Sequence, residues 1–154
     1  MTLYDVIKRL EAAAAQQPSV NMIVRQDIYR LNDIADARYG VFGWLQGQHR
    51  GDTSRSTRTY GFTLFFVDRL IEGEPLDDTE AAGMEAVQSV AVETLDNILK
   101  TLAADGLRVE PYVFRTFNQR FADQCAGAYV EAEIVAPINV TCEDLFVNKN
   151  LIIR

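Results

Sequence analysis

The order of the apolar segments predicts an α+β fold: an antiparallel β-sheet, a long helix packed across it and a short N-terminal helix. Helical periodicity is found in two places, near residues 3–14 and 79–105, and the strand-like segments are grouped before and after the longer of the two. Because 154 residues can enclose one sizeable core, we expect residues 1–154 to form a single domain.

The N-terminal segment is expected to form the short helix. Thr2 and Asp5 have the spacing of a capping box, in which each side chain accepts a hydrogen bond from the other residue's backbone. Pro18 marks a natural end, because proline cannot donate a backbone hydrogen bond. The apolar positions that repeat at helical spacing are Leu3, Val6, Ile7, Leu10, Ala13 and Ala14.

Three segments rich in branched and aromatic residues, 20–31, 38–46 and 59–70, are predicted to be strands, with a turn at 32–36 after the first. The last two would pair as a β-hairpin. The polar stretch between them is about a dozen residues long, more than most hairpin loops contain. We therefore expect a long mobile tip at about 47–58.

The second helix is expected from about Thr79 to Asp105, with Gly106 placed to end it. Asp77 and Glu80 have capping-box spacing. At about 1.5 Å per residue the helix is roughly 40 Å long, enough to cross a whole sheet. Its apolar face consists of Met84, Val87, Ala91, Leu95, Ile98 and Leu102. Its acidic side, expected in water, consists of Glu85, Glu93 and Asp96.

Three further apolar runs follow the second helix. Residues 107–117 contain Pro111, which favours an edge strand or a bulge. Residues 127–136 alternate, so Val130, Ala132 and Ile134 are predicted on one face and Tyr129, Glu131 and Glu133 on the other. The last run ends in LIIR, which is expected to add a short strand to this subunit or to a neighbouring one.

The charge distribution points to contacts between proteins. The net charge of −7 disfavours binding to phosphate backbones, so no sequence-specific nucleic-acid partner is expected. Residues 47–61 are locally basic, with three arginines against Asp52. Such a segment on an acidic body suits contact between unlike patches of neighbouring copies. The predicted interface residues are therefore Arg50, Arg55 and Arg58. A solvated loop with no partner remains the alternative.

No recognisable catalytic, cofactor-binding or metal-binding motif is present in the sequence. The nucleophile elbow and the phosphate-binding loop are both missing, and the single histidine, His49, is expected to be a solvated loop residue. Glu131 and Glu133 lie two residues apart on one strand face, where paired carboxylates can do acid–base work, but we expect them to form the wet face of a half-buried strand. The aromatic residues at 60, 62, 65 and 66 are expected to face the helix in the core, rather than to stack on nucleic-acid bases. An enzyme would need a pocket gathering groups such as Glu131, Glu133 and Arg120.

The N-terminal sequence and the cysteine content predict the cellular compartment. The N-terminus has no pattern of a signal peptide, and no apolar run reaches the roughly 20 residues that span a bilayer, so we expect a cytoplasmic protein without membrane contact. Cys125 and Cys142 are the only cysteines, and in a reducing compartment they are expected as two thiols without a disulfide.

The layout as a whole resembles the small tail-terminator and tail-completion proteins of tailed bacteriophages. The shared pattern is an N-terminal helix, a long-tipped hairpin ending in the aromatic strand TYGFTLFFVDRL, an acid-capped helix, and the late strand AYVEAEIVAP preceded by ADQCAG. The likeness covers most of the chain and is one of pattern. Cysteine and alanine around 125–128 and the tail after Pro137 depart from it.

The resemblance implies a virion structural protein, assembled in the host bacterial cytoplasm, that forms a hexameric ring and contacts tail-tube or head-connector proteins. It also implies no enzymatic activity and no cofactor. The basic segment would then be an arm that becomes ordered against a neighbouring copy, at a cost in conformational entropy that only contacts in the complex offset. A non-viral adaptor that uses the same sheet and arm on another protein is the alternative function.

Overall fold

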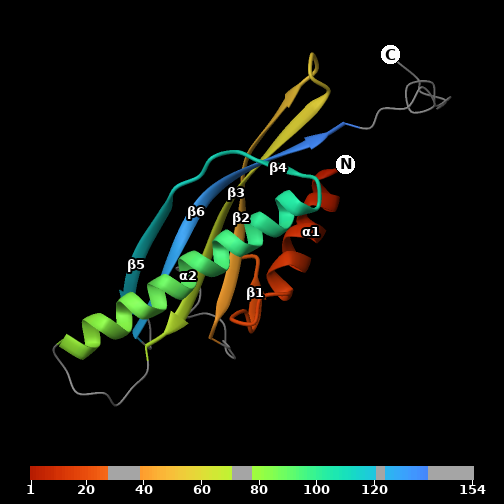
Figure 1. Cartoon of the computed structure of the whole chain (residues 1–154). Helices are drawn as coiled ribbons and strands as arrows, with labels where there is room; N and C mark the ends of the chain where they lie inside the picture. The colour runs from red at the N-terminus through yellow and green to blue at the C-terminus, as the bar shows by residue number, and fades with distance from the viewer. Residues whose placement is uncertain (28–38, 71–77, 121–123, 139–154) are drawn as a thin grey trace, which may run out of the picture.

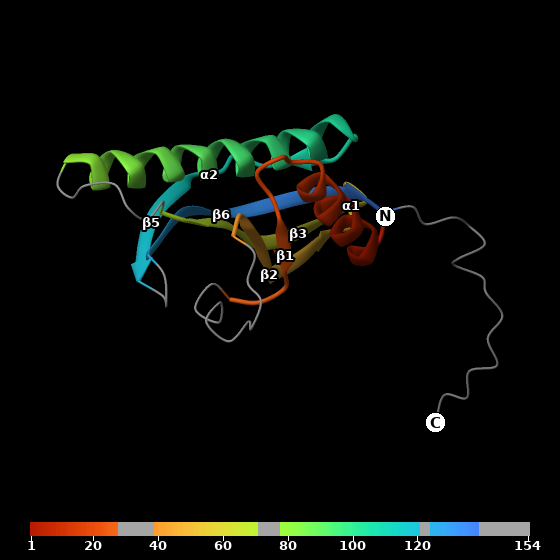
Figure 2. The same cartoon turned by 90° about the horizontal axis from the view of Figure 1, so that it is seen from below.

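The computed structural model describes residues 1–27, 39–70, 78–120 and 124–138. These residues form two layers, a β-sheet and a pair of helices that both lie on the same face of the sheet (Figures 1 and 2). The α+β prediction is confirmed, with a long helix across the sheet and a short N-terminal helix. None of the helices described is long and apolar enough to cross a membrane.

The sheet has six strands in the order β1-β2-β3-β6-β4, with β5 also paired to β6. Every pairing is antiparallel except that of β1 with β2, so the sheet is mixed rather than purely antiparallel. The parallel strand β1 is shorter than predicted, since only three residues of the segment 20–31 form a strand in the described part. Residues 28–36, which include the predicted turn, lie outside the described part. The strands are β1 (Met22–Val24), β2 (Val41–Asp52), β3 (Thr57–Arg69), β4 (Arg108–Val109), β5 (Phe114–Arg120) and β6 (Gln124–Pro137).

The N-terminal helix, α1 (Leu3–Ala15), has the predicted capping box. The backbone N–H of Asp5 donates to Thr2 Oγ1, and the Asp5 carboxylate accepts from the backbone N–H of Thr2 at 2.8 Å. These bonds satisfy donors that the first helical turn leaves unpaired. The apolar face is confirmed, since Val6, Leu10, Ala13 and Ala14 are buried.

The prediction for the hairpin is right about its existence and wrong about its tip. β2 continues to Asp52 and β3 starts at Thr57, so four residues separate the strands instead of about a dozen. The start of β3 is also paired on its other side, where Thr57 lies opposite Pro137 at the end of β6. Polar residues that lie in water on both faces of a strand do not alternate with apolar ones, and the sequence of such a strand therefore looks like a loop.

A β-bulge lies in the middle of the hairpin. The register of β2 against β3 shifts between Gln46 and His49, so that one extra residue is accommodated opposite Gly61. A Cβ at position 61 would lie 2.6 Å from the Gln48 carbonyl oxygen, which explains why glycine is needed there. Because side chains alternate between faces, the extra residue moves Arg50 to the face of the sheet opposite the helices.

The long helix, α2 (Asp78–Ala104), follows the predicted bounds closely. It ends because Gly106 adopts a positive φ of 90°, which lets the Leu107 N–H donate to the Leu102 carbonyl. Asp77, the expected cap, lies outside the described residues. The buried positions are Ala91, Thr94, Leu95, Ile98, Leu99 and Leu102. Met84 and Val87, which were predicted on the same face, are only partly buried.

Asp96 corrects the expectation that the whole acidic side of α2 lies in water. Its carboxylate is half-buried and accepts a hydrogen bond of 2.6 Å from the Tyr112 hydroxyl. It also pairs with Lys100 at 2.6 Å. Glu85 and Glu93 are exposed, as predicted. The pattern of α2 alone did not indicate that Tyr112, 16 residues later, folds back onto it.

The two central strands present alternate residues to the helices. On β6, Val130, Ala132 and Ile134 are buried beneath them as predicted, and Glu131 and Glu133 face the other side. On β3, residues 60, 62, 64 and 66 join the same core. Phe65 does not, because consecutive strand residues point to opposite faces; it packs in a second cluster with Val24, Val41, Val67 and Cys125.

Pro111 separates β4 from β5, and each of these strands pairs with β6 alone among the described strands, which confirms the predicted edge position. The proline cannot donate to a ladder, and the chain leaves regular strand geometry around it. Cys142 and the terminal LIIR lie outside the described residues, so the structure bears on neither the expected thiol at 142 nor the expected last strand.

Candidate subunit interface

The face of the sheet opposite the helices carries polar side chains over the half nearest the hairpin tip. We call this half the open face, because no described residue covers it (Figure 2). Its side chains come from three adjacent strands, and the register places Thr59 beside Val135 and Thr63 beside Glu131. Partly exposed threonines on a central strand are unusual for a sheet buried on both sides, so this face is built to meet water or another molecule.

Arg50 and Glu133 form the most specific contact of the open face. The Arg50 guanidinium donates to both carboxylate oxygens of Glu133, at 3.2 and 2.8 Å. The side chains are 66% and 45% exposed. Arg50, predicted for an interface between subunits, is therefore held by its own chain in this structure, and Glu133 is its partner.

The turn at the tip is organised by Asp52. Its carboxylate accepts hydrogen bonds from the Ser54 hydroxyl at 2.6 Å and from the backbone N–H groups of Ser54 and Arg55. These bonds to the charged form, that of the Ser54 hydroxyl foremost, lower the pKa of Asp52. The Arg55 guanidinium lies 3.9 Å from the same carboxylate and is three-quarters exposed, so it is only loosely held.

Arg58 lies on the other side of the hairpin from Arg50. It pairs in register with Ala136, whose side chain is buried beneath the helices. Arg58 is exposed and makes no hydrogen bond or ion pair with the residues that the structure describes. The structure thus brings Arg50 and Arg55 to the rim of one hollow and leaves Arg58 apart from them.

The base of the tip is joined to both ends of the described chain. The N–H of Ile138 donates to the Ser56 carbonyl at 2.8 Å, and the Met1 amine donates to the Pro137 carbonyl at 3.1 Å. The Tyr60 hydroxyl donates to the Met1 carbonyl at 3.3 Å. These contacts link the hairpin to β6 and to the start of α1, so the tip projects from a supported base (Figure 1).

His49 is exposed as predicted but belongs to strand β2 rather than to a loop. Its Nδ1 accepts from the Gly61 N–H at 3.3 Å, and its Nε2 lies 3.0 Å from Gln46 Oε1. The ring packs against Tyr60, with centroids 5.5 Å apart. His49 therefore links Gln46 and Gly61 across the bulge. Among the residues described, no three His, Cys, Asp or Glu side chains are grouped to hold a metal ion.

Two hollows lie side by side on the open face and share Arg50. One, of about 500 Å³, lies beneath the tip and includes Asp52, Arg55 and Arg108. The other, of about 800 Å³, is bordered by His49, Glu131 and Glu133. The side chain of Arg120, the third residue of the enzyme alternative, lies outside the described part. Two pairs form among the charged groups here, Arg50 with Glu133 and Arg108 with Glu110.

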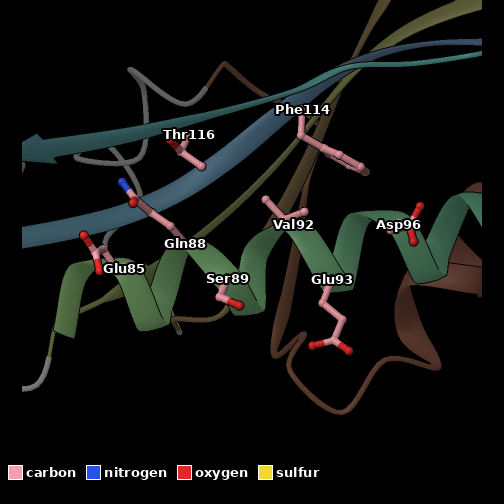
Figure 3. Close-up of a pocket in the computed structure, with 8 residues that line it drawn as sticks. All are labelled: Glu85, Gln88, Ser89, Val92, Glu93, Asp96, Phe114 and Thr116. Carbon is pink, nitrogen blue, oxygen red and sulfur yellow. The ribbon is translucent and has the colours of Figure 1, made fainter. Parts of the chain in front are cut away.

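A groove between α2 and β5 was not foreseen from the sequence. It has a volume of about 610 Å³ and is lined by the apolar residues Val92 and Phe114 and by the acidic residues Glu85, Glu93 and Asp96. Figure 3 shows Phe114 and Thr116 reaching from β5 toward Val92 and Gln88 of α2. The acidic residues of α2 could be seen in the sequence. The sequence did not show that β5 lies beside them.

No family model matches the sequence of this chain, and no curated protein matches it.

Proposed function

We propose that this chain is a structural protein that assembles with copies of itself, as a tail-terminator or tail-completion component of a tailed bacteriophage. In this role it forms a ring, with six copies as the expected number, at the tail end or neck of the virion. It joins tail-tube to head-connector proteins after assembly in the host cytoplasm. The proposal assigns it no catalysis and no cofactor.

The observation that carries the proposal is the one-sided construction of the sheet. Both helices cover one face, and the open face presents threonines and charged residues on regular strands. A strand surface whose side chains are fixed in register suits repeated contact with a partner of matching shape.

The strand edges support the same proposal. Within the described residues, β2 has no neighbour on its outer side from Leu45 to Asp52, and β5 has none on its outer side. Exposed edges offer unpaired backbone groups to another chain. Because these two edges lie on opposite sides of the sheet, contacts between copies would be head-to-tail, the kind that closes into rings.

Purified protein examined by negative-stain electron microscopy and by light scattering tests this function. The proposal expects rings of uniform diameter, and genes for other phage structural proteins beside this one. A protein that stays monomeric but becomes bound to an unrelated protein would instead support the adaptor alternative.

A further inference from the structure

Two surfaces of opposite charge lie at opposite ends of the molecule. One is the hairpin tip, defined as residues 52–58, and the other is the groove between α2 and β5. Thr116 of β5 pairs with Ala128 of β6, and Thr57 at the tip pairs with Pro137. Nine residues of extended strand separate these two levels, which is roughly 30 Å. The tip therefore cannot reach the groove of its own copy.

The groove carries an excess of negative charge over an apolar floor. Lys100 offsets Asp96, with which it pairs at 2.6 Å. Glu85 and Glu93 are exposed and form no hydrogen bond or ion pair within the described chain. Val92 and Phe114 between them provide a surface for the aliphatic part of a long side chain.

The tip carries an excess of positive charge. Asp52 is engaged by the backbone and the hydroxyl of the turn that it caps. Arg55 is three-quarters exposed, and Arg58 has no partner among the described residues. Both arginines have long aliphatic stems and planar guanidinium groups, which bind carboxylates through two parallel hydrogen bonds.

We propose that the hairpin tip of one copy docks in the groove between α2 and β5 of the next copy, with Arg55 and Arg58 facing Glu85 and Glu93. This inference rests on the proposed self-assembly and names its contact. The interface is head-to-tail, because the two surfaces differ and lie at opposite ends. Each copy gives one tip and receives one, so successive contacts close into a ring when their rotation permits.

Two charge-reversal variants test the contact. In the tip variant, R55E/R58E, an acidic tip faces an acidic groove; in the groove variant, E85K/E93K, a basic tip faces a basic groove. Each variant alone is expected to associate about 10- to 100-fold more weakly than the native chain, since lost pairs are replaced by repulsion. An equimolar mixture is expected to recover association, because each tip then meets a groove of opposite charge.

Sedimentation velocity of each variant and of the mixture provides the readout. The K8E/R69E variant is the control, because it changes the net charge by as much as the tip variant at exposed residues that belong neither to the tip nor to the groove. Circular dichroism and the fluorescence of Trp44, the single tryptophan, verify folding. If the native chain associates and the reversals leave it unchanged, or if the mixture fails to recover, the contact is overturned while self-assembly stands. If the native chain never associates, the proposed function itself fails.

Discussion

Arg50 of β2 reaches across β3 and donates two hydrogen bonds to Glu133 of β6, at 3.2 and 2.8 Å. The strand between them carries Gly61 opposite Glu133, and the bulge at 46–49 turns Arg50 to this face. The pair therefore depends on three strands and on one inserted residue. It ties the register of the hairpin to the central strand of the sheet.

A double-mutant cycle on Arg50→Ala and Glu133→Gln measures this pair. Because both side chains are about half exposed or more, we expect a coupling energy of about 0.2–1 kcal/mol in the free energy of unfolding. Urea denaturation followed by Trp44 fluorescence provides the measurement. A coupling energy of zero would contradict the expected stabilisation by the pair.

Phe65 packs on the backbone of Gly43 in the neighbouring strand. A Cβ at position 43 would lie 2.0 Å from the Phe65 ring, so Gly43→Ala must displace that ring. We expect a loss of about 1–3 kcal/mol in the free energy of unfolding. Gly51→Ala in the same strand is the matched control, because nothing lies within 4 Å of its added Cβ, and it should change stability by less than about 0.5 kcal/mol. Equal effects at the two positions would contradict the packing.

Leu95 is fully buried on the face of α2 that contacts the sheet. Leu95→Ala is expected to lower the free energy of unfolding by about 2–5 kcal/mol, since the substitution leaves a cavity that the core only partly closes. Val90→Ala in the same helix is the control, because Val90 is 44% exposed and should change stability much less. Thermal or urea denaturation of both variants checks the assignment of the buried face.

The hydrogen bond between Tyr112 and Asp96 makes the stability of the fold depend on pH in the alkaline range. Burial, together with the hydrogen bond to the Asp96 carboxylate, raises the pKa of Tyr112 from 10.0 to about 12. A raised pKa means that folding favours the protonated phenol, so this contribution to stability is complete below pH 10 and is lost as the pH rises toward 12. The Tyr112→Phe variant should therefore lose less stability than the native chain between pH 10 and 12. An ultraviolet titration in which Tyr112→Phe removes no late-titrating phenol would contradict this.

Asp96 acts at the other end of the pH range. The hydrogen bonds from Lys100 and Tyr112 lower the pKa of Asp96 below its ordinary value of 3.8. Folding therefore favours the charged carboxylate, and its contribution is present above that value and lost as the pH falls below it. Acid unfolding of Asp96→Asn should accordingly be less steep below pH 4 than that of the native chain. If the two proteins lose stability equally steeply below pH 4, the Asp96 carboxylate does not form these hydrogen bonds.

The helices and the central strands could be predicted from the sequence because their apolar residues repeat with a clear period. The capping box of Thr2 and Asp5 and the alternation from Val130 to Ile134 are local signals of this kind. The outer half of the hairpin was missed for the opposite reason. Residues 47–52 extend β2 with both faces polar, and only pairing with β3 reveals them as a strand.

The candidate interface was predictable in composition but not in arrangement. The local excess of arginine is visible in the sequence, yet it does not show that Arg50 is paired with Glu133, 83 residues away, while Arg58 lies on the opposite side. The groove between α2 and β5 depends on the return of the chain after Pro111. Such contacts between distant segments are determined by topology and not by local pattern.

The most direct test of self-assembly is sedimentation velocity or light scattering of the native chain over a wide range of concentration. The account predicts that the 17.3 kDa monomer gives way to one closed oligomer of uniform size as concentration rises, and that electron microscopy shows it to be a ring. A monomer at every concentration, with no ring in the images, would contradict it.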